Sequence, residues 1–431
     1  PPGYVRWTEN RNMQAFQEFI ASGRIDLSFL TTHAFDLEDA PKAYDLIVNR
    51  SEPFAGILIR YDRSKTHAPG PVPLKSDSSR IHASTHSRIN ATIGFLGAGS
   101  YAQSHLLPNI PKSNDVTLKG VMTATSTGSR SVGDRYGFEF CTGNPDDILD
   151  NEDINTVFIA SRHDSHAQYV QRALGQGKNV FVEKPLCLAE EELQEIKEKI
   201  EELAHEWSRI DANKKKASPP GGHEDHMISQ RTIRSGPPLL MVGYNRRFSP
   251  MLMEAREKLG QGPMAVTYRV NAGAIPPDSW IQDKEIGGGR IIGEVCHFVD
   301  SIIYLTGSLP VSLFASSLPD PHHHQDSVQV VMTFANSSTG TISYLANGDK
   351  AMPKERIEIF AHGASAVVDD YKELTWFAKG RKKRSKRFSQ DKGQKEEVRR
   401  FIEAVKTGGL PPISFEELYM TSLVTFRIHE S

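Results

Sequence analysis

The 431-residue chain has few cysteines, no excess of either charge and no long hydrophobic run. Its three cysteines, Cys141, Cys187 and Cys296, are far apart, which excludes a disulfide framework and a clustered metal site and fits the reducing cytoplasm. Its 51 Lys and Arg residues nearly balance 53 Asp and Glu residues, whereas a nucleic-acid or membrane-surface protein would show a basic asymmetry. No apolar run approaches the roughly 18 residues that span a bilayer. We therefore expect a cytoplasmic protein that acts on a small molecule, with no nucleic-acid, membrane or metal partner.

The first part of the chain is a small unit followed by a linker. Residues 1–62 show a helical, a strand, a second helical and a second strand pattern, which together make only a marginal core. Residues 63–89 are rich in Ser, Pro, His and Lys without an apolar period, so they predict a linker.

The rest of the chain predicts two α/β domains. Over residues 90–246, short apolar runs alternate with amphipathic stretches, which is typical of a doubly wound parallel sheet of the Rossmann type. Within it, residues 205–237 are far longer than an ordinary loop and are expected to be a flexible insertion. Over residues 247–431, strand patterns joined by turns and followed by two helices predict an α/β domain with an open, mostly antiparallel sheet.

A glycine motif stands where the first strand of the Rossmann-type region leads into a helix. Gly97 would permit the tight turn, Gly99 would let a pyrophosphate approach the backbone, and Ala102 would let the helix pack closely on the strand. The helix start, with Ser100 and Tyr101, would present free N–H groups to the phosphates. This placement predicts a dinucleotide site, and the alternative is a glycine-rich turn without a ligand.

The end of the second strand bears on which dinucleotide binds. NAD-specific sites usually place an acid on the ribose there, but this strand ends in hydroxyl residues that include Ser126, and Arg130 follows in the next helix. Because Arg can pair with a phosphate in bidentate fashion, we expect NADP in preference to NAD. Alternatively, Arg130 is an ordinary solvated helix residue.

Five motifs from residue 90 onward carry a family resemblance. GFLGAGSYA, FIASRHDSHA, NVFVEKPL, MVGYNRRFSP and GGGRIIGEVCHFVD, in that order and spacing, resemble the Gfo/Idh/MocA family of NAD(P)-dependent oxidoreductases. The resemblance implies hydride transfer between nicotinamide and a hydroxyl carbon of a sugar, nucleotide sugar or cyclitol. We also expect a homo-oligomer, a dimer or tetramer, formed through the second sheet. The alternative is a non-catalytic NAD(P)-binding sensor on the same fold.

The resemblance places the first catalytic group in an E-K-P motif. Glu183, Lys184 and Pro185 match that motif at the C-terminal end of a strand, where ligands bind in doubly wound sheets. Lys184 is then expected near the nicotinamide ribose and the reacting hydroxyl, whose oxygen its ammonium would polarise. Glu183 belongs to the same cofactor-facing motif, and Pro185 is expected to follow a cis peptide bond that aims Lys184 into the cleft.

The second catalytic group would come from a helix of the second domain. His297 matches the family's histidine and is expected to act as general base. Many members carry an Asp four residues earlier, where this chain has Gly293, and an acid follows one step later as Glu294. Glu294 could still orient His297 from the same helix face. Alternatively, His297 is a core histidine and Glu294 forms a structural ion pair.

Further cofactor and substrate contacts are implied by the remaining motifs. The loop after the fourth strand would contact the nicotinamide half through Ser161, His163 and His166. The domain junction and a later loop would contact the substrate through Tyr244, Arg246, Asn271 and Trp280. An Arg at the junction could pair with a substrate carboxylate or phosphate.

Residues 1–62 resemble a different family. WTENRN, HAFDLEDAPKAYDLI and FAGILIRYD are similar to the C-terminal end of a medium-chain zinc-dependent alcohol dehydrogenase, whose zinc and nucleotide sites would lie upstream. The chain thus looks like a truncated bacterial bi-domain oxidoreductase that keeps only the tail of its first enzyme. We expect no catalysis from this segment; the alternative is a small accessory cap.

Three conspicuous polar runs are given no function. Residues 322–324 (HHH) are not expected to hold a metal, because consecutive residues do not converge on one ion, and residues 223–226 (HEDH) are not, because they lie in the long insertion without a pattern that predicts order. The basic run at 381–387 (RKKRSKR) is expected to be a solvated loop.

Overall fold

The computed structural model describes residues 9–62, 70–74, 89–217, 236–260, 262–319 and 326–431. The chain divides into two compact units, residues 1–68 and 69–431. Several features of the sequence lie outside the described residues. These are Trp7 and Thr8, most of the expected linker, the end of the expected insertion with residues 223–226, and residues 322–324.

The first unit is a strand–helix–strand with a preceding helix. Its elements are α1 (Glu9–Ala21), η2 (Ser28–Leu30), β1 (Thr31–Asp36), η3 (Leu37–Asp39), α2 (Ala40–Asn49) and β2 (Gly56–Arg60), and β1 pairs with β2 in parallel. Their order matches the expected order. Ala43 and Leu46 are buried, whereas larger side chains such as Phe29 and Val48 are exposed. As the sequence predicts, the core of this unit is marginal.

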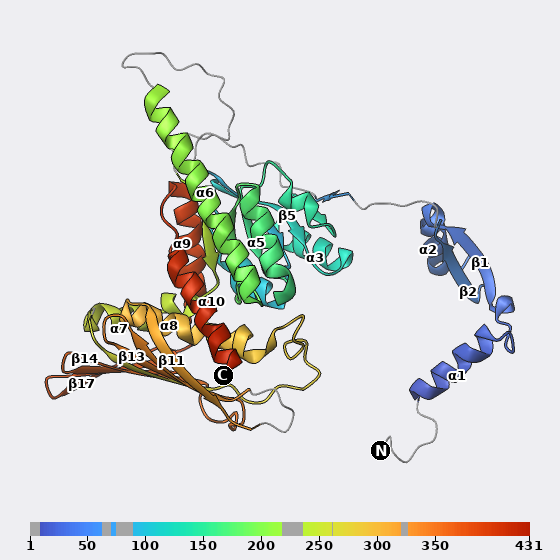
Figure 1. The fold of residues 1–431 in the computed structure, drawn as a ribbon. Helices are drawn as coiled ribbons and strands as arrows, with labels where there is room; N and C mark the ends of the chain where they lie inside the picture. The colour runs from blue at the N-terminus through green and yellow to red at the C-terminus, as the bar shows by residue number, and fades with distance from the viewer. Residues whose placement is uncertain (1–8, 63–69, 75–88, 218–235, 261, 320–325) are drawn as a thin grey trace. The chain divides into compact units, whose positions relative to one another are not determined.

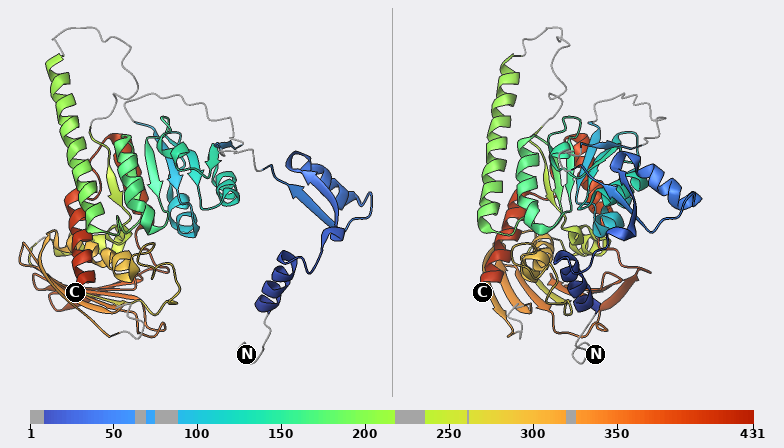
Figure 2. Two further views of the ribbon diagram at one scale, coloured as in Figure 1. Left: turned by 45° about the vertical axis from the view of Figure 1, so that its right-hand side comes forward. Right: turned by 90° about the vertical axis from the view of Figure 1, so that its right-hand side faces the viewer.

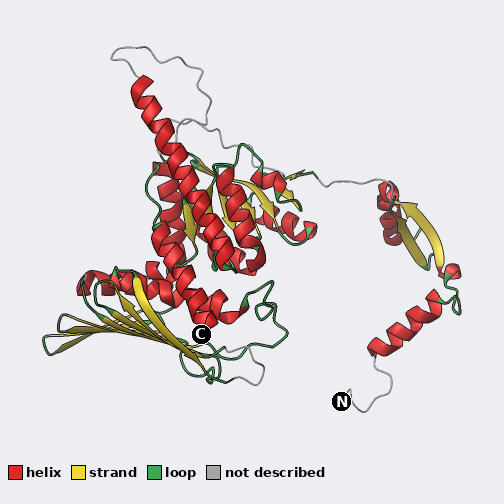
Figure 3. Cartoon of the chain, in the orientation of Figure 1, coloured by secondary structure: helices red, strands yellow, loops and turns green. Residues whose placement is uncertain are grey.

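The second unit begins with a seven-stranded sheet in the order β3-β6-β5-β4-β7-β8-β9. All of its neighbouring strands are parallel except β3, which is antiparallel to β6. The strands are β3 (Val72–Pro73), β4 (Ala91–Leu96), β5 (Val116–Met122), β6 (Phe140–Thr142), β7 (Thr156–Ile159), β8 (Asn179–Val182) and β9 (Leu240–Val242). Figure 3 shows this sheet between helices. The predicted Rossmann fold is confirmed, and Val72 and Pro73 of the expected linker extend its edge.

Helical elements join these strands. They are η4 (Ala102–Leu106), η5 (Leu107–Asn109), α3 (Ser126–Tyr136), α4 (Asp146–Leu149), η6 (His163–Ser165), α5 (His166–Gly175) and α6 (Glu190–Ala217). The last of them is longer than the sequence suggested. The expected insertion starts at residue 205, yet α6 continues to Ala217 and stands out at the top of Figure 1. Its sequence is rich in Glu, Lys and Ala and has no Gly or Pro before it ends, so helix propensity carries it on.

The second domain is built on an eight-stranded sheet in the order β11-β12-β13-β10-β14-β15-β16-β17. Its pairs are antiparallel except β10 with β13, which confirms the expected mostly antiparallel sheet. The strands are β10 (Ala265–Asn271), β11 (Pro310–Ser317), β12 (Val328–Phe334), β13 (Thr339–Leu345), β14 (Glu355–Ala361), β15 (Ala364–Asp369), β16 (Glu373–Ala378) and β17 (Arg381–Lys386).

The basic run expected as a loop is instead the edge strand β17. All six of its residues are exposed, so no apolar alternation marked it as a strand. It is held by pairing with β16 and by ion pairs from Arg384 and Lys386 to Glu373. A charged edge of this kind resists pairing with another sheet.

Helical elements accompany the strands of the second domain. They are η8 (Asn245–Phe248), α7 (Pro250–Leu259), η9 (Ile291–Val295), α8 (Cys296–Thr306), α9 (Gln394–Thr407) and α10 (Phe415–Glu430). Figures 1 and 2 show α7 and α8 on one side of the sheet, with its other side bare of helices. In contrast, α9 packs into the Rossmann core, where Phe401 lies 5.6 Å from the rings of both Phe158 and Phe181. The end of the chain therefore ties the two domains together.

Candidate active site

The glycine motif forms a tight loop between β4 and the following helix. Gly97 has φ +87°, and a Cβ on it would lie 2.3 Å from the backbone nitrogen of Ser161. No heavy atom lies within 4 Å of where a Cβ on Gly99 would be. Ala102, in the π-helical turn η4, is buried, whereas Ser100 and Tyr101 are exposed. The loop therefore leaves open backbone at Gly99, as close approach of a pyrophosphate requires.

The end of β5 presents hydroxyls rather than a carboxylate. Thr125 caps α3 by accepting a hydrogen bond of 3.1 Å from the Gly128 amide, and Ser126 is exposed beside it. Arg130 is half exposed and pairs with Asp134 at 2.8 Å. A guanidinium in an exposed ion pair remains available to a phosphate, because such a pair is only weakly held.

The loop after β7 holds the E-K-P turn in place. His166 is fully buried, and its Nδ1 lies 2.7 Å from the carbonyl oxygen of Pro185, while Nε2 lies 3.2 Å from that of Ser161. Burial lowers the pKa of His166; the two carbonyl contacts raise it by less, and the nearby Lys184 ammonium lowers it further. His166 thus braces the backbone under Lys184 and carries no charge at neutral pH.

Lys184 joins the two domains at the start of the η9–α8 helix. Its Nζ donates a hydrogen bond of 2.8 Å to the carbonyl oxygen of Gly293. The Lys184–Pro185 peptide bond is cis, as expected. The neighbouring Glu183 is buried, and this burial raises its pKa to about 7. Lys184 therefore lies between the carboxyl ends of the Rossmann strands and the helix that carries His297.

His297 is a buried, neutral imidazole. Burial lowers its pKa well below the usual value, and the cations Arg246, Lys184, Lys354 and Lys392 lower it further. Its Nδ1 has no hydrogen-bond partner among the described residues. The buried Tyr244 ring packs edge-on against it at 6.2 Å. A neutral imidazole is in the state that can accept a proton.

Glu294 pairs with other side chains than His297. Its carboxylate lies 3.3 Å from the Arg290 guanidinium and 3.6 Å from Lys354 Nζ. These cations outweigh burial and leave the pKa of Glu294 lowered. The expected orientation of His297 by Glu294 has no hydrogen bond to support it, because the π-helical turn Ile291–Val295 interrupts the regular helical spacing between them.

The junction arginines are bound by carboxylates within the protein. Arg246 makes two hydrogen bonds to Glu355, at 2.8 and 3.0 Å, and Arg247 is held by Asp300 and Glu417. Both guanidinium groups are buried. Pairing with Arg246 and Lys392 holds the pKa of Glu355 well below its usual value, against its burial. A substrate anion would have to compete with these carboxylates for Arg246.

Trp280 and Asn271 have different surroundings. Trp280 is 37% exposed and meets the His163 ring edge-on at 4.9 Å. Asn271 is buried and donates to the carbonyl oxygens of Asp349 and Met352, while its Oδ1 has no partner among the described residues. His163 is itself buried, and burial with the Lys184 charge lowers its pKa to about 3.

The predicted residues fall into two neighbouring sets. Lys184, His163, Trp280 and the helix start at Gly293 form one contiguous cluster, with His297 on the same helix. Gly97 joins this cluster to the dinucleotide loop through Ser161. Ser126 and Arg130 stand apart from it, at the next strand of the sheet.

Sequence reasoning missed the ionic framework behind this cluster. Glu355, Lys354 and Lys392 surround Arg246 and His297. No motif marks them, and Glu355 stands 109 residues from Arg246. Alternation along β14 could only have indicated that Glu355 occupies an inward position, where a buried acid needs partners.

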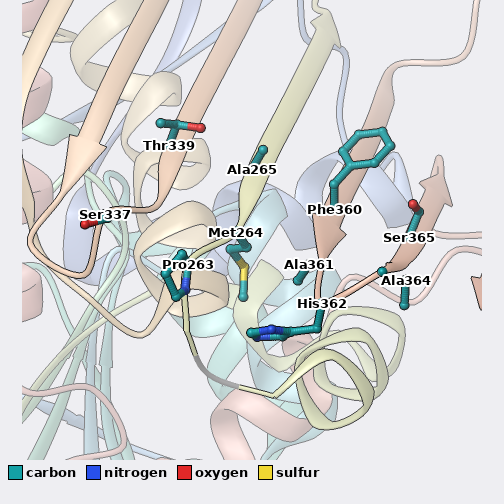
Figure 4. A pocket seen from close by; sticks show the side chains of 11 residues that line it. Pro263, Met264, Ala265, Ser337, Thr339, Phe360, Ala361, His362, Ala364 and Ser365 are labelled. Carbon is teal, nitrogen blue, oxygen red and sulfur yellow. The ribbon is translucent and has the colours of Figure 1, made fainter.

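A separate hollow lies at the far end of the second sheet and shares no residue with this cluster (Figure 4). It is lined by the start of β10 and the β14–β15 turn, including Met264, Ala265, Phe360 and His362. Among the described residues, no group of His, Cys, Asp and Glu side chains could hold a metal ion, and no helix is long and apolar enough to cross a membrane.

Comparisons with known proteins agree with this architecture. A family model described as "Oxidoreductase family, NAD-binding Rossmann fold" matches residues 91–206, and one described as "GFO/IDH/MocA C-terminal domain" matches residues 258–367. Myo-inositol 2-dehydrogenase of Thermotoga maritima is 24% identical over 79% of this chain and 95% of its own length. Inositol 2-dehydrogenase of Rhizobium meliloti is 27% identical over 64% and 74%.

A solved structure shares the fold at low identity. Levoglucosan dehydrogenase in complex with NADH and levoglucosan superposes with a TM-score of 0.63 at 22% identity, covering 79% of this chain and 97% of the other. The two family models together span more than half of the chain. The chain therefore belongs to the Gfo/Idh/MocA family of NAD-binding oxidoreductases.

Proposed function

We propose that this protein transfers hydride between a nicotinamide dinucleotide and a hydroxyl carbon of a sugar, nucleotide sugar or cyclitol. The observation that carries the proposal is the hydrogen bond between Lys184 and Gly293, which brings a strand-end ammonium to the helix of a neutral His297. Relatives named as inositol dehydrogenases support the substrate class. The open backbone at Gly99 fits a dinucleotide.

The two side chains divide the charge changes of the reaction between them. In the oxidative direction His297 accepts the hydroxyl proton, and the Lys184 ammonium stabilises the negative charge that develops on the oxygen. When bound, the nicotinamide supplies the hydride acceptor. His166 keeps Lys184 in position through the Pro185 carbonyl oxygen. The Tyr244 ring packs edge-on against His297.

The cofactor is NADP in preference to NAD in this proposal. Thr125 and Ser126 offer hydroxyls where an NAD-specific site would carry an acid, and the Arg130 guanidinium stands one helical turn further on. The sterically open position of Ser126 allows a 2′-phosphate to reach both groups. The solved structure of levoglucosan dehydrogenase contains NADH. Titration of this protein with both NADPH and NADH therefore tests the proposed preference.

The bare face of the second sheet supports the proposed homo-oligomer. Val311, Phe314, Val331 and Phe360 are exposed on or beside it. An exposed apolar patch of this kind is typical of a protein–protein interface. We place the protein in the cytoplasm, where its three free, buried cysteines remain reduced.

Residues 1–62 contribute no catalysis in this proposal. Their exposed apolar side chains, such as Phe29 and Val48, suit a segment that packs against another protein surface. This exposure fits both the proposed relationship to a medium-chain zinc-dependent dehydrogenase and an accessory cap. The catalytic assignment rests on residues 90–431 alone.

Cofactor titration and a lysine variant test the function. Fluorescence titration should show saturable binding of NADPH or NADH, and absence of both would contradict the dinucleotide site. Lys184→Met should lower kcat by about 10²- to 10⁴-fold while leaving the cofactor Kd within about threefold. A sensor would bind cofactor but turn over no sugar or cyclitol before or after the substitution.

A further inference from the structure

One cation beside the catalytic cluster is not bound within the protein. Arg162 is exposed, and its guanidinium carbon lies 5.8 Å from the centre of the Trp280 ring. Among the described residues, no carboxylate forms an ion pair with Arg162, including Asp164 two positions further on. The charged group of Arg162 contacts the Trp280 ring.

Arg162 and Trp280 are connected to the reacting groups by direct packing. The Trp280 ring meets His163 edge-on at 4.9 Å, and His163 Nδ1 lies 2.8 Å from the Gly287 carbonyl oxygen. A Cβ on Gly293 would be 3.2 Å from the same imidazole. Because Lys184 donates to the Gly293 carbonyl oxygen, a chain of contacts runs from Arg162 through Trp280 and His163 to the backbone that Lys184 binds.

The other cations near the cluster are already bound by carboxylates. Arg246 and Lys392 share Glu355, and Arg290 and Lys354 share Glu294. Lys184 is assigned to the oxygen of the reacting carbon. Arg162 differs from the paired cations because no carboxylate among the described residues binds it.

We propose that the substrate carries an anionic substituent, a carboxylate or a phosphate, which Arg162 binds while Trp280 packs against the sugar ring. A guanidinium matches either anion with two parallel hydrogen bonds, and an aromatic face beneath it restricts its rotamers before the substrate arrives. This inference rests on the proposed function and narrows it to sugar acids or sugar phosphates. It also transfers the anion-binding role from Arg246 to Arg162.

Matched substrates test the inference. Initial rates with NADP and NAD would be compared for neutral hexoses and inositols and for their charged counterparts, such as glucose against glucuronate, gluconate and glucose 6-phosphate. A charged member should exceed its neutral counterpart in kcat/KM by at least about tenfold. Preference among the carboxylates or for the phosphate then identifies which anion Arg162 binds.

Arginine variants supply the second arm. Arg162→Ala should lower kcat/KM for the charged substrate by about 10- to 100-fold, mainly through KM. It should leave kcat/KM for the neutral counterpart and the Kd of the cofactor unchanged. Arg162→Lys should recover part of the loss. Arg135→Ala is the matched control, because Arg135 is likewise exposed and lies 5.5 Å over a ring, that of Tyr136.

Three results would overturn the inference. The first is a higher kcat/KM for neutral substrates than for charged ones. The second is an equal loss of kcat/KM for charged and neutral substrates in Arg162→Ala. The third is a loss of NADPH binding in Arg162→Ala as large as the loss of substrate binding, which would assign Arg162 to the cofactor. In each case the proposed dehydrogenase function stands. No turnover of any substrate by cofactor-loaded protein would instead overturn the proposed function and this inference with it.

Discussion

Gly97 and Ser161 are packed backbone to backbone, with a Cβ on Gly97 predicted by geometry to fall 2.3 Å from the Ser161 nitrogen. The contact joins the end of β4 to the end of β7, its neighbour in the sheet. Gly99, two residues on, has no such neighbour. The two glycines of one motif therefore meet different demands, the first from the fold and the second from the ligand.

Alanine at each glycine should separate these demands. Gly97→Ala combines a backbone clash with a positive φ and should lower the free energy of unfolding by about 2 kcal/mol or more. Gly99→Ala should leave thermal stability unchanged and weaken NADPH binding by about tenfold or more, since its methyl would occupy the space of the pyrophosphate. Thermal unfolding and cofactor titration measure both. Equal loss of stability in the two variants would contradict the distinction.

The buried state of His297 predicts the pH dependence of catalysis. Because its pKa is lowered well below the usual value, the imidazole should remain neutral as pH falls through 6.5. Oxidative kcat/KM should therefore show no acid limb near pH 6.5. His297→Asn should lower kcat by about 10²- to 10⁴-fold, whereas His362→Asn, at an exposed turn, should not. An acid limb near pH 6.5 that His297→Asn abolishes would contradict this state of the histidine.

Cofactor preference should depend on Arg130. Arg130→Ala should weaken NADPH binding by about tenfold, because one charge-assisted contact to the 2′-phosphate is lost, and leave NADH binding unchanged. The control is Asp134→Ala, which removes the partner of Arg130 and should not weaken NADPH binding. Parallel titrations with both cofactors measure the ratio. A similar effect on NADH and NADPH would assign Arg130 a purely structural role.

The sequence predicts local elements well and long-range contacts poorly. The strand–helix alternation and the Gly97 motif identify the Rossmann sheet, because apolar period and turn chemistry are local. By contrast, the Lys184–Gly293 and Arg246–Glu355 contacts each span 109 residues. No periodicity relates such positions. The resemblance supplied Lys184 and His297, but only the fold shows that Arg246 is bound by Glu355.

Spacing also misleads where backbone geometry departs from the regular helix. A separation of three residues predicts that Glu294 and His297 share a helix face, which holds for an uninterrupted α-helix. The π-helical turn Ile291–Val295 breaks that register, and Glu294 pairs with Arg290 instead. Similarly, the exposed strand β17 had no apolar alternation to reveal it. Both differences arise from features that hydrophobic pattern does not encode.

Two carboxyls, Glu183 and Glu397, are buried, and the charge of Glu183 acts on Glu397. Both oxygens of Glu397 and Oε1 of Glu183 lack a hydrogen-bond partner among the described residues. Burial, and next the charge of Glu183, raises the pKa of Glu397 well above the usual 4.5, and burial raises that of Glu183 to about 7. Like charges this close cannot both ionise cheaply, so the pair holds at least one proton near neutral pH.

Glutamine at Glu397 should therefore stabilise the protein increasingly as pH rises. The unfolded wild-type chain releases the Glu397 proton near pH 4.5, whereas the folded state holds it to a higher pH, so wild-type stability from this group is lost as pH rises between those values. Chemical denaturation at pH 5 to 8 should show Glu397→Gln gaining at most about 1.4 kcal/mol per pH unit over wild type. The neighbouring Glu396→Gln is the control, because its effect should stay constant between pH 5 and 8. Arg399 and Arg400 lower the pKa of Glu396 to about 2, so this variant should lose stability above pH 4.5 and the loss should shrink as pH falls toward 2. A difference in the free energy of unfolding between Glu397→Gln and wild type that stays constant from pH 5 to 8 would show that burial does not keep the Glu397 carboxyl protonated.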